Sequence, residues 1–304
     1  MTADGPVVML AGGTGGAKLA RGMLDLAGED LVVIANTGDD VEIYGAHVSP
    51  DPDLVTFWLA DRIDERGWGL DGDTFHAMDQ LRELGVDVWF NLGDRDLAIC
   101  LERARMLRAG ESQTRAQARL ADAFGIAATV LPMSDQPVRT AVLAAGRWWP
   151  LQEFMIRHRG AGPVQDVEFR HARAARPTAA ALEAIEQARA IVIGPSNPVI
   201  SIGPILAVPG LRHALVASPA PVVAVSPLVA GRVLKGPTAA CLEWAGQAAD
   251  SDGIAAIYEP LLDGLVADSV AASVTTLQID VLLDTPERRR AVAEATLTFA
   301  TSLA

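Results

Sequence analysis

The amino-acid sequence predicts an α/β fold in which helices cover both faces of a mostly parallel sheet. Two early strands, residues 7–10 and 30–35, are almost continuously apolar, which is typical of parallel strands buried on both faces. A stretch of helical periodicity, residues 17–26, lies between them. Glycines and polar residues follow both strands, and open α/β sheets bind ligands at these carboxyl ends. The pattern therefore favours a ligand-binding α/β protein.

The later segments are assigned by the same periodicities. Between residues 53 and 125 the pattern is helical apart from a strand-like run at 86–90, so we expect a helical insertion with helices at 54–63, 74–84, 97–107 and 114–124. Strands are expected at 128–131, 138–144, 190–193, 222–225 and 277–282. Helices are expected at 179–188, 210–217, 238–249 and 286–302, and residues 157–177 are expected to be irregular and exposed. Together these elements predict one three-layer, Rossmann-like domain over residues 1–304.

Composition narrows the class of protein. The chain has 304 residues, half of them hydrophobic and 21% charged, which indicates a globular protein with a large core. Its longest apolar runs, 7–11 and 31–35, fall far short of the ~20 residues that span a bilayer. The N-terminus lacks the basic start of a signal peptide, and two cysteines, Cys100 and Cys241, make neither a disulfide scaffold nor a metal spacing. We expect a cytoplasmic protein that does not bind a membrane.

The formal net charge of −13 argues against a nucleic-acid partner, because binding to nucleic acid requires a basic face. It also constrains any site for phosphates. Such a site must offset the protein's own negative field locally, with backbone N–H groups, a few cations or a divalent metal.

The most informative motif is Ala-Gly-Gly-Thr-Gly-Gly-Ala-Lys at residues 11–18. A strand that ends in glycines before a helix presents unpaired N–H groups beside the positive end of the helix dipole, which is a phosphate-binding geometry. The alternative is a tight glycine turn without a ligand. Ala17 and Leu19 exclude a Walker A loop, and Lys18 stands where a dinucleotide fingerprint needs its third glycine. The predicted phosphate-binding residues are Gly12, Gly13, Thr14, Gly15, Gly16 and Lys18.

Acidic turns recur where strands are predicted to end and helices to begin. The second strand runs into Asn36-Thr37-Gly38-Asp39-Asp40, and aspartates recur at 51, 53, 71, 73, 94 and 96. Such residues often cap helices, and Asp53 and Asp73 are expected to be simple caps. Asp51 stands between two prolines, and a carboxylate fixed in this way suits Mg²⁺ or a hydroxyl nucleophile better.

Arg95 lies between two of these aspartates, in Asn-Leu-Gly-Asp-Arg-Asp at residues 91–96. Its guanidinium has the geometry for forked contacts with a phosphate or carboxylate. The alternative is an ion pair with its flanking aspartates on the surface.

A second loop, Gly194-Pro195-Ser196-Asn197-Pro198, ends a buried strand and is followed by Ser201. It offers a hydroxyl to a phosphate and an amide to a purine edge. Val225-Ser226-Pro227 ends the next strand in the same way, so the strand ends predict one continuous ligand crevice. Among the six tryptophans Trp68 is flanked by glycines, which makes it the best candidate to stack on a flat ligand, whereas most of the others are expected in the core.

These motifs, in this order, resemble the 2-phospho-L-lactate transferase (CofD/FbiA) family of coenzyme F-420 biosynthesis. The resemblance rests on the two glycine motifs at 11–18 and 194–206, on the segments 36–40, 49–53 and 92–96, and on Leu-Pro-Met-Ser-Asp at 131–135. It covers nearly the whole chain and weakens after about residue 240. Pro52 departs from the family, which usually has leucine or a similar residue there.

The resemblance implies a Mg²⁺-dependent transferase that works as a homodimer. The acceptor would be Fo (7,8-didemethyl-8-hydroxy-5-deazariboflavin), a flat deazaflavin with a ribitol tail. The donor would be guanosine diphosphate joined to a lactyl, enolpyruvyl or glyceryl acid. The ribitol hydroxyl would attack the phosphorus that bears the acid, and GMP would leave, giving F-420-0 or its dehydro form.

The resemblance also assigns roles to residues. Asp51 is expected at the metal or at the acceptor hydroxyl, Asp39 as a second metal ligand, and Arg95 at the donor or Fo. Further binding residues are expected to be Asn36, Thr37, Asp40, Trp68, Ser134, Asp135, Gly194, Ser196, Asn197 and Ser201.

Two other functions stay open at this point. One is a UDP-sugar-binding regulator of the related gluconeogenesis-factor group, which shares the glycine-rich start but usually reads Gly-Pro-Gly-Ser-Leu-Tyr-Thr-Ser where this chain has Gly-Pro-Ser-Asn-Pro-Val-Ile-Ser. The other is a nucleotide-binding α/β protein without catalysis.

Overall fold

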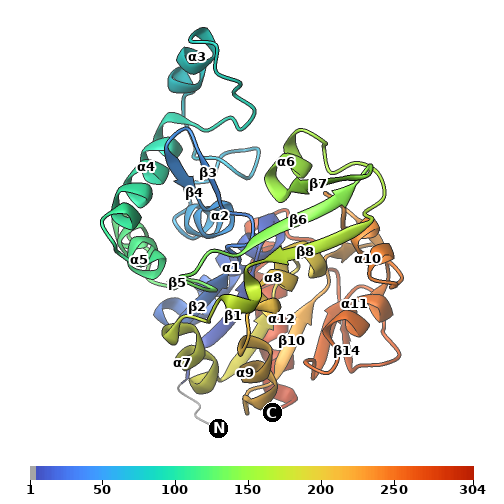
Figure 1. Cartoon of the computed structure of the whole chain (residues 1–304). Coiled ribbons are helices and arrows are strands. Elements are labelled where there is room, and N and C mark those ends of the chain that lie inside the picture. The colour runs from blue at the N-terminus through green and yellow to red at the C-terminus, as the bar shows by residue number, and fades with distance from the viewer. Residues whose placement is uncertain (1–4) are drawn as a thin grey trace.

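The computed structural model describes residues 5–304, so the first four residues of the predicted domain and N-terminal segment lie outside it. Its centre is a seven-stranded sheet in which all neighbouring strands are parallel, in the order β14-β13-β10-β9-β1-β2-β5 (Figure 1). The strands are β1 (Val7–Ala11), β2 (Leu31–Ala35), β5 (Thr129–Pro132), β9 (Ala190–Ile193), β10 (Val222–Val225), β13 (Gly264–Ala267) and β14 (Thr276–Gln278). The predicted α/β class is confirmed.

Helices cover both faces of this sheet, because its central strands bury apolar side chains on both sides. In β1, Val8 and Leu10 belong to one apolar core, while Val7, Met9 and Ala11 belong to the other. The first core is closed by α7 (Ala179–Gln187), α8 (Gly203–Ala207), α9 (Leu211–Ala217) and α11 (Ser251–Tyr258). The second core is closed by α1 (Gly13–Ala27), α2 (Pro50–Leu59) and α12 (Pro286–Ser302).

A long insertion separates β2 from β5. It contains the hairpin β3 (Val41–Ile43) and β4 (Ala46–Val48), then α2 and three further helices, α3 (His76–Glu83), α4 (Asp94–Arg108) and α5 (Gln113–Ala123). Figure 1 shows α3 standing away from the sheet at the tip of the molecule. The predicted strand at 86–90 was wrong. Val88 and Phe90 pack instead on a small apolar cluster around Met78 and Cys100, so these apolar residues do not need a sheet to be covered.

A second, antiparallel sheet lies across the carboxyl edge of the main one (Figure 1). Its strands are β6 (Arg139–Ala144), β7 (Arg147–Pro150) and β8 (Asp166–Arg170), with α6 (Leu151–Ile156) after β7. The segment 157–177 was predicted to be irregular but contains β8. Its residues alternate between polar and apolar because only one face of the small sheet is covered, which gives a weaker signal than a buried strand.

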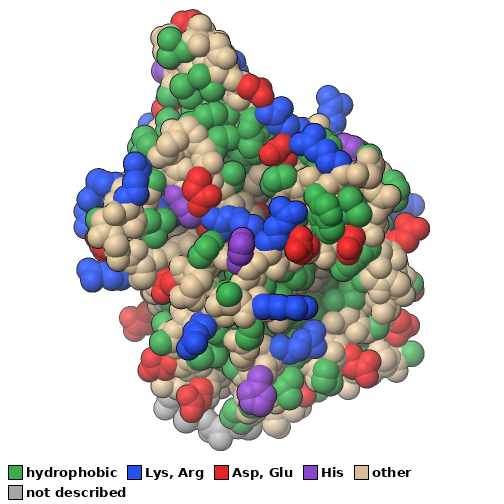
Figure 2. Space-filling view, in the orientation of Figure 1, with side chains coloured by type: hydrophobic (Ala, Val, Ile, Leu, Met, Phe, Trp, Pro, Cys, Tyr) green, Lys and Arg blue, Asp and Glu red, His purple; other side chains and the backbone are tan. Residues whose placement is uncertain are grey.

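The C-terminal part adds the short hairpin β11 (Leu228–Val229) and β12 (Arg232–Val233) and helix α10 (Thr238–Trp244). The predicted strand at 277–282 ends early, since β14 stops at Gln278. Within residues 5–304 no single helix has the length and apolar composition to cross a membrane, although the bent pair Pro198–Ala207 and Leu211–Ala217 meets these two criteria together. On the face shown in Figure 2, acidic and basic side chains are interspersed.

Candidate active site

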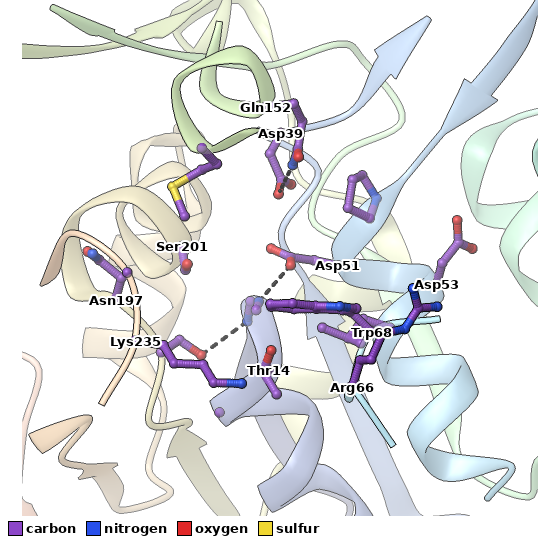
Figure 3. Close-up of a pocket in the computed structure, with 18 of the residues that line it drawn as sticks. Thr14, Asp39, Asp51, Asp53, Arg66, Trp68, Gln152, Asn197, Ser201 and Lys235 are labelled. Atoms are coloured by element: carbon purple, nitrogen blue, oxygen red, sulfur yellow. Dashed lines mark hydrogen bonds between the residues drawn. The ribbon is translucent and has the colours of Figure 1, made fainter. Parts of the chain in front are cut away.

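A cavity of about 930 Å³ opens where the strands β1, β9 and β10 end. These strands are neighbours in the sheet, so the loops after them meet, as the sequence predicted. The start of α1, the insertion and the loops after β9 and β12 form its walls (Figure 3). The lining includes the predicted residues Gly12, Gly13, Thr14, Gly15, Lys18, Asp39, Asp51, Trp68, Ser196, Asn197 and Ser201.

The glycine motif forms the first turn of α1 rather than an open loop. Gly13 has φ +62°, which favours glycine, and lets the chain turn from β1 directly into the helix. A helix leaves its first four N–H groups without helical partners, here those of Gly12 to Gly15. Gly12 N–H donates to Ser196 Oγ over 3.3 Å, and Gly13 N–H donates to Asp51 Oδ1 over 2.6 Å. The N–H groups of Thr14 and Gly15 remain at the cavity for a ligand.

Close packing explains the next glycines. A Cβ on Gly15 would lie 2.0 Å from the carbonyl oxygen of Pro195, so only glycine lets α1 approach the loop after β9. Gly16 and Gly194 pack between this loop and β1 and do not line the cavity. The motif therefore brings two ligand-binding loops together, besides offering N–H groups.

Two carboxylates, Asp39 and Asp51, face the cavity next to this helix start (Figure 3). Asn36 joins them, because its Nδ2 donates to Asp51 Oδ2 over 2.9 Å and to Asp39 Oδ1 over 3.2 Å. Gln152 of α6 donates to Asp39 Oδ2 over 3.0 Å. Asn36 is itself fixed, since its Oδ1 accepts the N–H of Gly38. Both carboxylates are therefore held in place by neutral donors.

The charges of Asp39 and Asp51 are not compensated. No Lys, Arg or His nitrogen of residues 5–304 lies within 4.0 Å of either carboxylate, although both side chains are buried. Burial, together with the charges of Asp51 and Asp40, holds the pKa of Asp39 well above its usual range. Burial also raises the pKa of Asp51 from 3.8 to about 6, against the hydrogen bonds from Gly13 and Asn36, which lower it. The pair has the electrostatics of a cation site.

Asp40, the neighbour of Asp39, has a structural environment instead. It accepts hydrogen bonds from Ser49 Oγ and Gln113 Nε2, both over 2.7 Å, and pairs with His47 over 3.1 Å. Burial disfavours the charged form of His47, but hydrogen bonds to Asp40 and Glu42 outweigh it and raise its pKa to about 9. Asp40 therefore holds the insertion to the sheet. Asp40, Thr37 and Asn36 do not line the cavity.

Asp53 forms a buried ion pair rather than the expected cap. Arg103 of α4, fully buried, donates to both of its carboxylate oxygens and to the carbonyl of His47. The ligand atoms of Asp53, Asp96 and Cys100 lie within 4.8 Å of one another, which is a possible metal cluster. Because Arg103 already neutralises Asp53, and because Mg²⁺ prefers oxygen to thiol ligands, Asp39 and Asp51 fit Mg²⁺ better.

Three further predicted residues lie outside the cavity lining. Arg95 Nη1 donates to the carbonyl of Asp71 over 3.3 Å, which points it away from the site. Asp135 accepts the N–H and hydroxyl of Thr114 at the start of α5, both over 2.8 Å. Ser134 accepts the N–H of Gln136 over 3.1 Å. In this structure all three make local contacts, so their binding roles stay predictions that this geometry does not support.

Cations and aromatic rings surround the carboxylate pair. Lys18 and Lys235 line the cavity, and Lys18 has a lowered pKa because of burial and of the nearby charges of Lys235 and Arg289. Trp68 is 58% exposed and turns into the cavity, with the Lys235 ammonium 5.0 Å from its ring centre (Figure 3). Asn197 lines the site but uses its Oδ1 to cap the turn that begins at Pro198, so its carbonyl is occupied.

Sequence reasoning missed three residues of this site. Gln152 and Lys235 gave no local signal, because each is a single polar residue in an unremarkable context. Asp96 belongs to a motif that the sequence did single out, but the sequence favoured its neighbour Arg95.

Comparisons with known proteins show which family this chain resembles. The family model described as "2-phospho-L-lactate transferase CofD" matches residues 7–295. A 2-phospho-L-lactate transferase of Methanosarcina mazei is 39% identical, over 86% of this chain and 86% of that protein. A phosphoenolpyruvate transferase of Kitasatospora aureofaciens is 40% identical, over 86% of this chain and 85% of the relative.

A crystal structure of a UPF0052 family member from Bacillus halodurans shares the fold, with a TM-score of 0.64 at 17% identity over 97% of this chain and 99% of that one. The sequence relatives are much more similar than this, and the family model's range, residues 7–295, includes the start of α1, the acidic pair and the loop after β9. The chain belongs to the 2-phospho-L-lactate transferase CofD family.

Proposed function

We propose that this protein transfers a phospho-three-carbon-acid group from a guanosine diphosphate-linked donor to the ribitol hydroxyl of Fo, releasing GMP. Its relatives carry the names 2-phospho-L-lactate transferase and phosphoenolpyruvate transferase, which support a transferase in coenzyme F-420 biosynthesis. The acid carried by the donor is lactyl, enolpyruvyl or glyceryl.

The observation that carries the proposal is the uncompensated pair Asp39 and Asp51 beside the start of α1. Both carboxylates are buried, and no protein cation among the described residues lies within 4.0 Å of them. They offer oxygen atoms as ligands, which fits a hard divalent cation. We infer that they would hold Mg²⁺, which when bound would screen the diphosphate and polarise its oxygens.

The chain itself supplies the remaining contacts with the donor. The free N–H groups of Thr14 and Gly15 would face its phosphates, and Lys18 and Lys235 would add positive charge. In Figure 3, Ser201 and Asn197 lie on one side of Asp51 and Asp53 lies on the other. We place the nucleotide on the side of Ser201 and the acceptor on the side of Asp53.

The reaction balances without a covalent intermediate. The ribitol oxygen forms a bond to the phosphorus that bears the acid, the bond from this phosphorus to the GMP oxygen breaks, and the hydroxyl proton is released to solvent. Such a transfer depends on positioning and charge neutralisation. Asp51, fixed through Gly13 and Asn36, is the group proposed to orient the hydroxyl or the metal.

The test is product formation by the purified protein. Mixed with Fo and Mg²⁺, one of the three guanosine diphosphate esters should yield equimolar GMP and a phosphorylated deazaflavin, measured by chromatography and mass spectrometry. The ester that reacts identifies the acid. No GMP from any of the three would refute the proposal. The expected homodimer and cytoplasmic location stay predictions, to be examined by light scattering and fractionation.

A further inference from the structure

Of the three aspartates around the start of α4, two have structural roles. Asp94 accepts hydrogen bonds from Thr74 Oγ1 and from the N–H groups of His76 and Ala77, which fixes the start of α3. Asp73, which precedes α3, accepts hydrogen bonds from the N–H groups of residues 95 and 96 and so caps the start of α4. These reciprocal caps explain why both residues are acidic. The Asp96 side chain takes no part in these caps, although it lies in the first turn of α4.

Asp96 lines the cavity and has few partners. Its contact within α4 is the thiol of Cys100, whose Sγ lies 3.7 Å from Oδ1. In the part of the chain that the structure describes, no Lys, Arg or His nitrogen lies within 4.0 Å of its carboxylate, whereas nearby Asp53 is fully engaged by Arg103. Burial, and the charge of Asp53, raise the pKa of Asp96 to about 7. A carboxyl group that opens into a cleft, and whose one side-chain hydrogen-bond partner among residues 5–304 is a thiol, is typical of a ligand contact.

Aromatic side chains of the insertion line the same cavity as Asp96. Phe57 lies one turn after Asp53 on α2 and lines the cavity, as do Trp89 and Phe90, which precede α4. These rings come from the insertion, and the polar nucleotide loops come from the sheet. This aromatic end suits a flat ring, and its carboxylate repels phosphates and accepts N–H or O–H groups.

We propose that Asp96 recognises the acceptor by accepting a hydrogen bond from an N–H or O–H group on its flat ring. This rests on the proposed function, in which the acceptor is a hydroxylated deazaflavin with a ring N–H between two carbonyls and a ring hydroxyl. Either group would donate to the carboxylate, and this contact would fix the ring while its ribitol tail reaches Asp51.

Equilibrium binding tests the inference independently of turnover. Calorimetry should show that Asp96→Ala weakens Fo binding at least ~10-fold, the loss expected for one hydrogen bond to a charged acceptor, and leaves GDP binding within about twofold. Asp96→Asn keeps one acceptor oxygen and should fall between wild type and Asp96→Ala. The thermal unfolding temperature should change little in both variants, because this half-buried side chain has only the Cys100 thiol as a side-chain hydrogen-bond partner among residues 5–304.

Methylated acceptors identify the donor group. Wild type should bind Fo methylated either at the ring nitrogen or at the ring hydroxyl more weakly, and Asp96→Ala should not distinguish that analogue from Fo. Cys100→Ala is the matched control, and it should bind Fo like wild type.

Four results would overturn the inference. Equal losses for Fo and GDP would indicate a general structural role, and a loss for GDP alone would place guanine at this end. Binding of Zn²⁺ or Mn²⁺ that disappears in both Asp96→Ala and Cys100→Ala would make the cluster a metal site. If wild type binds Fo and releases GMP while Asp96→Ala binds Fo normally, this inference fails and the proposed function stands.

Discussion

Replacing Asp51 by asparagine should separate stability from activity. The substitution keeps the size of the side chain and removes a buried charge that no protein cation offsets. In the absence of Mg²⁺, ionising this buried group lowers the free energy of unfolding of the wild-type protein. Burial raises its pKa from 3.8 to about 6, and at about 1.4 kcal/mol for each pH unit this corresponds to about 3 kcal/mol at pH 7.

The substitution also has a cost. Asp51 accepts hydrogen bonds from Gly13 N–H and Asn36 Nδ2, whereas an asparagine has a single acceptor oxygen. Losing one bond to a charged acceptor costs about 1.5 kcal/mol. At pH 7 without Mg²⁺, Asp51→Asn should therefore be more stable than wild type by roughly 1.5 kcal/mol, the difference between these two values.

The size of the effect depends on pH. Because the folded-state pKa of Asp51 is raised, its contribution to wild-type stability is fully present below pH 3.8 and is lost as the pH rises through about 6. Near pH 4 Asp51 is protonated in the folded state and, like asparagine, has one good acceptor oxygen, so the variant gains nothing there and should be no more stable than wild type. The advantage of the variant in unfolding free energy should therefore disappear as the pH falls from 7 to 4.

Urea unfolding at several pH values, with EDTA or with Mg²⁺, measures this directly. Mg²⁺ should stabilise wild type at pH 7 and leave Asp51→Asn unchanged, while turnover of the variant falls at least ~100-fold and its GDP affinity changes less than ~10-fold. Asp53→Asn is the matched control on the same helix, and it should be destabilised throughout because Arg103 loses its partner. An Asp51→Asn variant that is less stable at pH 7, or that keeps near-normal turnover, would refute the reasoning.

Three further substitutions test other contacts. Lys18→Ala should weaken binding of the guanosine diphosphate donor about tenfold and leave Fo binding unchanged by calorimetry, and equal losses would remove this lysine from the phosphate site. Arg103→Met leaves Asp53 buried without a partner and should cost about 3–5 kcal/mol in urea unfolding, much of it recovered by adding Asp53→Leu; a loss under about 1 kcal/mol would contradict a buried ion pair. Trp68→Phe should reduce the quenching of tryptophan fluorescence by Fo, and unchanged quenching would exclude stacking on this ring.

The sequence was sufficient for most of the strands that are buried on both faces, but it missed β13. The strands β1, β2, β9 and β10 are short apolar runs between turns, and local pattern alone identifies such strands. The sequence was not sufficient where an apolar segment is covered by something other than the main sheet and its helices. Residues 86–90 pack on a satellite cluster, and β6 pairs in a separate sheet, because coverage depends on segments far away in the chain.

The site shows the same division. Asp51 was predicted from its two prolines, but these begin helix α2 rather than a stiff turn, and the helix aims the carboxylate at the N–H of Gly13, 38 positions away. Arg95 and Asp96 are adjacent on α4, where consecutive side chains point about 100° apart. The Asp73 cap sets the rotation of this helix start, and it turns Asp96 to the cavity and Arg95 outward. Sequence spacing carries no information about that rotation.

A net charge of −13 is compatible with an anionic donor because the charges are sorted locally. Many exposed or half-buried arginines are paired with acids, as in Arg139 with Glu42 and Arg157 with Asp87. Lys18 and Lys235 are different, since neither forms an ion pair with any residue of the described chain and the charge of Lys235 helps to lower the pKa of Lys18. Like charges kept together at a cavity raise the free energy of the empty site, and an anion lowers it. The repulsion between the two lysines therefore destabilises the empty site and is relieved when the donor binds. The net charge of the chain bears on its solubility, whereas the local arrangement of charges at the cavity predicts the ligand.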